Sequence, residues 1–152
     1  MSLPSIFNSM STVLREVQAG ELLRTNLESG KYGLTLSADD VKEIVEVRDQ
    51  VLQSYGRLEL DIGVTVKIIQ AFCTSSYISQ EEYGGIIKEL QEVFYYMKNE
   101  TGDEIGDDAL IAIMKDYFEN SCHGSVELLQ GRELEEFARG IRCGGHERGA
   151  LL

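Results

Sequence analysis

Apolar residues recur every three or four positions along most of this chain. The longest such run follows Ser79, where seven side chains fall on one helical face: Tyr83, Ile86, Ile87, Leu90, Val93, Phe94 and Met97. An isolated helix of this kind is marginal in water, so its apolar face must be buried against other helices. The spacing therefore predicts a mainly α-helical protein.

Similar spacing recurs over four more segments: 10–17, 41–55, 107–118 and 134–141. The segment 64–73 is largely apolar and predicts a central buried helix, although its β-branched residues leave a strand open as an alternative. We expect an irregular bundle of five to six helices with short connections. Tyr55 is assigned to the buried face of its helix.

Several helix ends can be assigned from single residues. Ser37 is the predicted N-cap of one helix, and Gly56 is predicted to end that helix. Ser79 and Glu82 have the spacing of a capping box. Asp107 is predicted to cap a later helix, where its charge favours the helix dipole.

Two short segments, 32–36 and 57–61, alternate apolar and other residues and flank the same helix. They leave open a small two-stranded ribbon, although such a unit is marginal without further support. The only proline is Pro4, and no proline- or serine-rich linker occurs. We expect one helical domain over 9–141, followed by a flexible glycine-rich tail at 142–152.

The composition excludes several classes of protein. Hydrophobic residues make up 43% and charged residues 26% of the chain, which is typical of globular proteins. A net charge of −12 argues against direct binding of nucleic acid or of an anionic membrane. No apolar run is long enough to span a bilayer, and the first residues lack the pattern of a signal peptide. The cytoplasm is therefore the expected location. Three cysteines cannot all pair within one chain, so we expect no disulfide framework.

The negative charge is concentrated in one part of the chain. The segment 79–119 contains eleven acidic residues and three lysines, a balance of −8. Solubility is the simplest explanation for this excess. Docking to a basic partner is the alternative.

The segment 94–118 resembles a helix, an acidic loop and a second helix, which raises the question of a calcium-binding loop. Counted from Asn99, the sixth loop position is Glu104, where a glycine is needed for the turn. The twelfth is Leu110, where a bidentate glutamate is needed. We therefore expect no calcium site, and a helix connection in its place.

Both histidines and two of the three cysteines lie close together in the sequence: Cys122, His123, Cys143 and His146. Cys143 and His146 have the spacing of half a zinc site, although adjacent residues such as Cys122 and His123 rarely ligate one metal together. A buried Cys122 and a mobile tail explain the same residues without a metal. Cys73, beside Phe72, is expected to be a buried, unreactive thiol.

Motifs of common enzymes and cofactor sites are absent. The sequence has no G-x-G-x-x-G, no phosphate-binding loop and no H-E-x-x-H. Paired acids occur at predicted helix starts, where capping and solvation account for them. We expect no cofactor, and we assign no catalytic residue.

Three tyrosines are candidates for a binding surface. The run of Phe94, Tyr95 and Tyr96 covers too much of a helix to lie in one buried stripe, so Tyr95 or Tyr96 must point elsewhere. Tyr77 precedes a predicted helix and is expected to anchor its start. Tyrosines of this kind are common in interfaces, and equally common beneath loops.

Several short stretches of the chain have a familiar pattern: Tyr32, Gly33, Leu34, Thr35 and Leu36; Phe72, Cys73 and Ser75; Tyr77 and Ile78; Phe94, Tyr95, Tyr96, Lys98, Asn99 and Glu100; Gly124 and Ser125. In these residues the chain resembles an uncharacterised family of small bacterial proteins from Gram-positive anaerobes and gut bacteria. The likeness spans roughly Leu23 to Glu135, although the family pattern has Asp and Pro near Thr74 and Ser76. The resemblance implies one full-length domain of a cytosolic bacterial protein. Because the family has no assigned activity, it implies no catalytic residue.

Three functional hypotheses follow. The first is a non-enzymatic helical domain that binds a protein partner, or a second copy of itself. The second is a metal- or thiol-dependent protein that uses Cys122, His123, Cys143 and His146. The third is an enzyme with an acid–base pocket that no motif reveals.

Overall fold

The computed structural model describes residues 3–141, except for the side chains of 3–11, 132 and 133. The predicted fold class is confirmed: the described part is an all-helical bundle without a strand. A helix at 134–141 accompanies five helices of ten or more residues. These five are α1 (Leu3–Arg24), α3 (Ala38–Ser54), α4 (Gly63–Phe72), α5 (Gln80–Glu100) and α6 (Asp107–Asp116).

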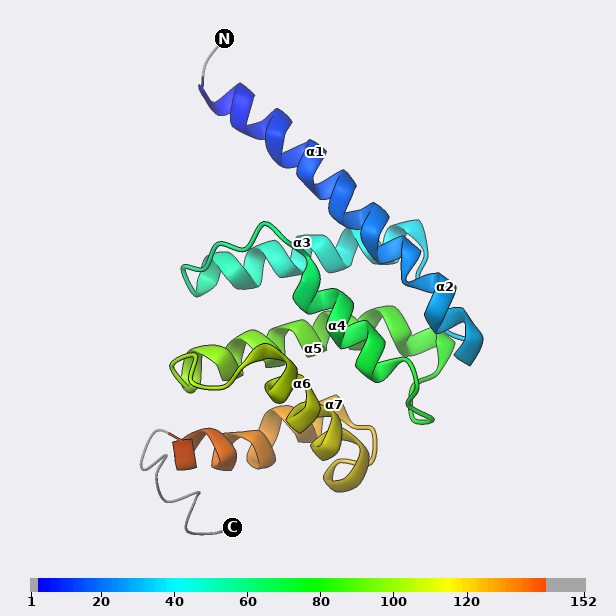
Figure 1. The fold of residues 1–152 in the computed structure, drawn as a ribbon, viewed down its shortest axis with the longest axis vertical. Helices are drawn as coiled ribbons and strands as arrows, with labels where there is room; N and C mark the ends of the chain where they lie inside the picture. The colour runs from blue at the N-terminus through cyan, green and yellow to red at the C-terminus, as the bar shows by residue number, and fades with distance from the viewer. Residues whose placement is uncertain (1–2, 142–152) are drawn as a thin grey trace.

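Figure 1 shows how the helices are arranged. α3, α5 and the helix at 134–141 lie one below another, while α4 and α6 run steeply across them. The main packing is α3 along α5, with α1 against α3 and α4 against α6. The first part of α1 extends away from the other helices. None of the helices described is long and apolar enough to cross a membrane.

Two π-helical turns connect the last elements. α6 continues into η2 (Tyr117–Ser121), and the short α7 (Val126–Leu128) continues into η3 (Leu129–Glu133). Gly131 has the non-helical angles φ −81° and ψ −122°, and the chain changes direction there before 134–141. Gly131 therefore forms a kink between two helical segments.

The predicted helix ends are only partly correct. Ser37 caps α3 through a reciprocal capping box with Asp40, and Gly56 adopts a left-handed φ of 64° just after that helix. The box predicted at Ser79 does not form, because the Ser79 hydroxyl bonds to the Glu82 carboxylate rather than to the backbone. Asp107 is the first residue of α6 and not its cap, which is Gly106.

The two-stranded ribbon considered for 32–36 and 57–61 is absent. Side-chain amides replace the missing partner strand at the first segment. Gln80 exchanges two hydrogen bonds with the backbone of Thr35, at 2.8 and 2.9 Å. Asn26 exchanges two with the backbone of Leu36, at 2.7 and 2.9 Å. Because these groups are already satisfied, no second strand is needed.

Arg48 on α3 satisfies backbone carbonyls of the second segment, 57–61. It is 1% exposed, and its Nη2 donates to the carbonyls of Glu59 and Asp61 at 2.6 and 2.7 Å. Gln18 on α1 donates to the carbonyl of Leu60 at 2.9 Å. The segment between α3 and α4 is therefore held by two buried polar side chains, Gln18 from α1 and Arg48 from α3.

Tyr83 on α5 gives the core a pH dependence. It is wholly buried, and its hydroxyl makes no hydrogen bond of good geometry with the described residues. Burial raises the pKa of Tyr83 to about 12, and the nearby Ser29 hydroxyl only moderates this rise. The neutral phenol is therefore the form that the folded state prefers.

Stability is consequently expected to fall as pH rises from 10 towards 12. In that window the unfolded chain releases the Tyr83 proton while the folded chain keeps it, which costs about 1.4 kcal/mol per pH unit. Urea unfolding of wild-type protein and Tyr83→Phe across this range measures the effect. The variant is expected to have the shallower pH dependence, and equal slopes would contradict the assignment.

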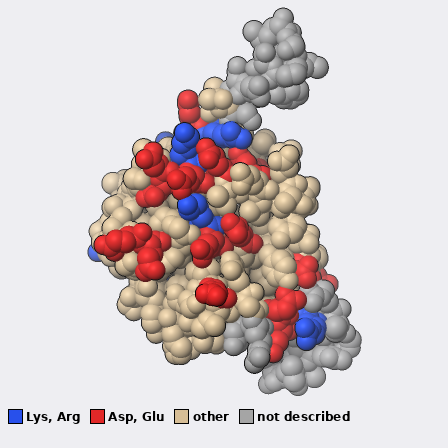
Figure 2. All heavy atoms as spheres, turned by 180° about the vertical axis from the view of Figure 1, so that it is seen from behind, with Lys and Arg blue, Asp and Glu red and all other residues tan. Residues whose placement is uncertain are grey.

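Acidic side chains dominate the surface. Figure 2 shows the face opposite that of Figure 1, on which Asp and Glu side chains gather in several groups with fewer Lys and Arg. Most lysines and arginines of the body are engaged in ion pairs, such as Lys88 with Glu43 at 2.6 Å and Lys98 with Asp107 at 2.8 Å. The remaining carboxylates give this face a negative potential.

Candidate binding groove

A groove lies between the end of α3, the second half of α5 and the chain around η3. Its volume is about 280 Å³. That is at the lower end of the range for small-molecule pockets, and it suits a single side chain better than a large cofactor. Seven residues line it: Tyr55, Glu92, Val93, Tyr96, Met97, Gln130 and Leu134.

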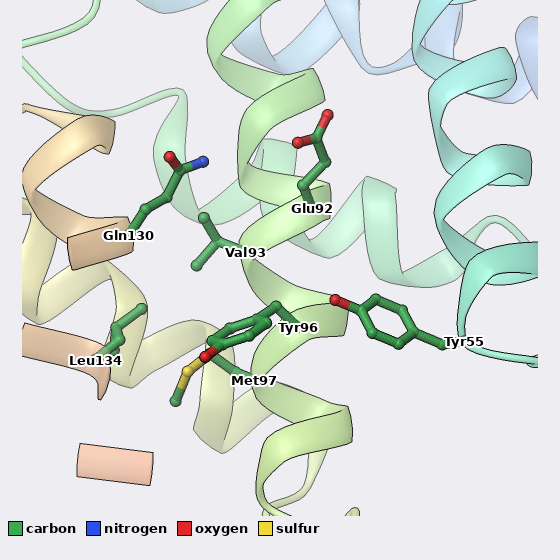
Figure 3. Close-up of a pocket in the computed structure, with 7 residues that line it drawn as sticks. All are labelled: Tyr55, Glu92, Val93, Tyr96, Met97, Gln130 and Leu134. Atoms are coloured by element: carbon green, nitrogen blue, oxygen red, sulfur yellow. The ribbon is translucent and has the colours of Figure 1, made fainter. Parts of the chain in front are cut away.

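Three segments distant in sequence position these side chains. In Figure 3, Tyr55 points from the end of α3 towards α5, and Gln130 and Leu134 approach Val93 from the opposite side. Tyr55 is the C-cap of α3, so its ring lies where the chain leaves the helix. It is half-buried and packs against the edge of the core, so its assignment to the buried face is partly confirmed.

The four residues from α5 follow from helical spacing. Residues three and four apart share a face, so Glu92, Val93, Tyr96 and Met97 form a patch one turn deep. Val93 and Met97 are buried and form the floor, whereas Glu92 is exposed at the rim. Leu134, which is 1% exposed, completes the apolar floor.

The electrostatics of the groove are negative. The Tyr96 hydroxyl donates to the Glu135 carboxylate. Burial raises the pKa of Tyr55, and the charges of Glu100 and Glu92 raise it further. Tyr55 is therefore a neutral hydrogen-bonding group at physiological pH and not a base. No lysine, arginine, histidine or cysteine is among the described side chains that line the groove.

This arrangement can bind but has no evident means of catalysis. A nucleophile needs an adjacent base, and general acid–base chemistry needs a group whose pKa lies near 7. The described lining offers two phenols, one exposed carboxylate, one amide and apolar carbon. Such a surface suits an apolar or cationic group.

The structure separates the three predicted interface tyrosines. Tyr96 is half-buried and lines the groove. Tyr95 lies wholly in the core, where it donates to Glu59 at 2.5 Å, so it has no surface to offer a partner in this fold. Burial, and then the bond to Glu59, raises the pKa of Tyr95. Tyr77 is 45% exposed, and its role in an interface stays a prediction.

The acidic loop examined for calcium is a helix connection held by ion pairs. Gly102 and Asp103 both adopt left-handed φ values, of 62° and 60°. Arg57 donates to both oxygens of Asp103 at 3.2 and 2.5 Å, which lowers the pKa of that carboxyl. Lys98 donates to the carbonyl of Ile105 at 2.8 Å. Asp103 is thus held against the bundle by Arg57 and Lys98.

The metal and thiol hypothesis rests partly on residues outside the described part. Cys143 and His146 lie there, as does the predicted tail at 142–152. Cys122 is buried, and His123 is exposed with a left-handed φ of 49°. Within 3–141, no three His, Cys, Asp or Glu side chains cluster as metal ligands. The zinc hypothesis stays a prediction.

The other predicted thiol is in the core. Cys73 is 2% exposed, and burial raises its pKa, as does the charge of Glu28. The thiolate, which is the reactive form, is therefore disfavoured.

Sequence reasoning missed Gln130 and the outward position of Tyr55. Gln130 lies in the short helical turn η3, and its polar side chain gives no periodic signal. For Tyr55, its place directly before Gly56 was the available clue, because a C-cap residue leaves the helical face that precedes it.

Comparison with known proteins gives a family and no activity. No curated protein matches the chain, and no solved structure matches it. A model of a family of unknown function, DUF6323, matches residues 21–147. This range includes every residue of the groove and starts near the end of α1. Because the match covers most of its length, the chain belongs to the DUF6323 family.

Proposed function

We propose that this protein is a non-enzymatic protein-interaction domain. The observation that carries the proposal is the groove between α3, α5 and η3, which combines an apolar floor, two tyrosines and a carboxylate. Tyrosines with an apolar ring and a polar end are enriched in protein interfaces. The described lining lacks the nucleophile–base pair that an enzyme would need.

Exposed apolar side chains support the same proposal. Leu58 is 85% exposed and Leu60 is 62% exposed, on the segment between α3 and α4. Val13 and Val17 are 60% and 52% exposed, one helical turn apart on α1. Apolar surface of this kind marks interaction sites when it is contiguous, and self-association is one way to cover it.

The proposal includes a place for the interaction. We infer the cytoplasm of a bacterium, which the family resemblance and the odd number of cysteines support. The partner is a protein, because the negative surface does not suit nucleic acid or anionic lipid.

Site-specific cross-linking tests the proposal. A photoreactive amino acid at Gln130, an exposed residue of the groove, is expected to cross-link in the native host to one protein or to a second copy of this chain. The same amino acid at Tyr32, which is 53% exposed on η1 (Gly30–Tyr32), is the control. The captured protein must also bind the purified chain.

Light scattering on the purified protein completes this test. If light scattering shows a dimer and the photoreactive residue at Gln130 cross-links two copies of the chain, self-association is supported as the interaction. A monomer at every concentration, together with no cross-linked protein that binds on purification, would overturn the proposed function.

A further inference from the structure

We infer that one face of α5 is a docking trough for an extended basic segment of a partner protein, with one cationic side chain in each of two hollows. The inference rests on the proposed function and deepens it by naming the partner's chemistry. The groove described above is the first hollow. The second lies further along the same helix, and the name acidic trough is used below for the two together.

The second hollow lies between the first half of α5 and the start of α7. Its volume is about 390 Å³. Ile86 and Val126 supply apolar surface, and three carboxylates surround it. The residues that line it are Glu82, Gly85, Ile86, Glu89, Gly124, Ser125, Val126 and Glu127.

Both hollows open on the same side of α5. At 100° per residue, Glu82, Glu89, Glu92 and Tyr96 fall within one stripe of the helix, in which the glutamates are exposed and Tyr96 is half-buried. The opposite wall is also one continuous piece of chain, from Gly124 to Leu134. A single ligand that follows α5 would therefore meet both hollows.

The spacing of the hollows sets the spacing of the cations. Their α5 residues are centred roughly nine positions apart, which is about 14 Å at 1.5 Å per residue. An extended chain covers this distance in about four residues at 3.3 Å each. The trough thus fits a segment of the form Arg-x-x-x-Arg.

Charge complementarity argues for a basic occupant. Four glutamates line the two hollows, Glu82, Glu89, Glu92 and Glu127, and no Lys, Arg or His is among the described lining. Glu92 forms no ion pair with a described residue. Carboxylates grouped without cations attract a basic partner and penalise an acidic one.

The first hollow has the chemistry to hold an arginine. The stem of an arginine can lie on Val93, Met97 and Leu134 while its guanidinium reaches Glu92 at the rim. The rings of Tyr55 and Tyr96 flank this path, and a guanidinium on a tyrosine face gains a cation–π attraction. The apolar floor favours arginine over a small inorganic cation, which would gain nothing from it.

Peptide titration followed by amide NMR shifts tests the trough. The probe is a glycine- and serine-rich peptide with Arg-x-x-x-Arg at its centre, and its control has citrulline, a neutral isostere, at both positions. The arginine peptide is expected to shift amides lining both hollows and to bind about five- to tenfold more tightly than the citrulline peptide. Equal affinity, or shifts elsewhere on the molecule, would overturn the inference.

Matched variants locate the charges that matter. Glu89→Gln with Glu92→Gln removes one carboxylate from each hollow, two of the four in the trough, whereas Glu16→Gln with Glu46→Gln makes the same change in net charge at exposed positions on α1 and α3. Only the first pair is expected to lose the preference for arginine. Equal losses would show attraction to net charge alone and would overturn the trough.

The outcomes separate the inference from the proposed function. A complex captured through Gln130 that keeps its affinity in the Glu89 and Glu92 variant would overturn the trough and leave the interaction function intact. A peptide that binds the trough as expected, in a protein for which no partner or dimer is found, would support the trough and overturn the function.

Discussion

Replacing Arg48 with methionine is expected to lower the free energy of unfolding by about 2–4 kcal/mol, since two partly buried carbonyls lose their donor and each loss costs roughly 1–2 kcal/mol. The acceptors are the carbonyls of Glu59 and Asp61, which Arg48 reaches at 2.6 and 2.7 Å. Methionine fills much of the same volume but donates no hydrogen bond. The loss is therefore a loss of polar contacts and not of packing.

Urea unfolding of Arg48→Met measures this loss. Arg15→Met is the control, because Arg15 is exposed and pairs with Asp49 at 2.8 Å on the surface. Such a pair contributes about 1 kcal/mol or less. Equal effects of the two variants would show that Arg48 does not organise the segment between α3 and α4.

Gly124→Ala is the second large effect expected. Gly124 has a left-handed φ of 83°, and an added Cβ would lie 2.3 Å from the Cβ and 2.5 Å from the Cγ of Tyr77. The conformation costs about 1–2 kcal/mol for a residue with a side chain, and the overlap about 1–3 kcal/mol more. The start of a side chain cannot swing away, so the backbone itself must move.

Gly102→Ala separates the two contributions. Gly102 has a φ of 62°, and nothing lies within 4 Å of its added Cβ. It is expected to show only the conformational cost, about 1–2 kcal/mol. Thermal unfolding of both variants measures the difference, and a Gly124→Ala protein no less stable than Gly102→Ala would contradict the contact with Tyr77.

The helices could be predicted from sequence because each one repeats the same physical requirement. The stripe from Tyr83 to Met97 must be buried, and α5 indeed carries it into the core. Ser37 begins α3 through its capping box, and Gly56 follows the end of α3 with a left-handed φ. Both features depend on a few neighbouring residues. Spacing and single residues are sufficient for such features.

The links between helices could not be predicted in the same way. Gln80 satisfies the backbone of Thr35, and Arg48 satisfies that of Glu59, across gaps of 45 and 11 residues. The spacing of residues in a helical segment does not indicate which distant backbone group a polar side chain will bind. The alternating segments 32–36 and 57–61 were therefore considered as strands. In the structure, side chains make the backbone hydrogen bonds that a partner strand would make.

The candidate site was predictable only in part. The crowding of Phe94, Tyr95 and Tyr96 correctly indicated that one tyrosine leaves the core stripe, and Tyr96 is the one that lines the groove. Tyr95 is wholly buried, and the acceptor for its hydroxyl is Glu59, which lies 36 residues earlier in the chain. The groove itself combines three distant segments, so no local motif could have revealed it.

A charge swap tests the central claim, that the acidic trough recognises a cationic side chain of a partner protein. Glu92→Arg in this chain, and Arg→Glu in the trough-bound segment of the partner, are each expected to weaken the complex. Combining them is expected to restore binding, because the ion pair is re-formed with its charges exchanged. Losses that simply add, with no restoration in any pairing of Glu92 with the partner's arginines, would contradict the account.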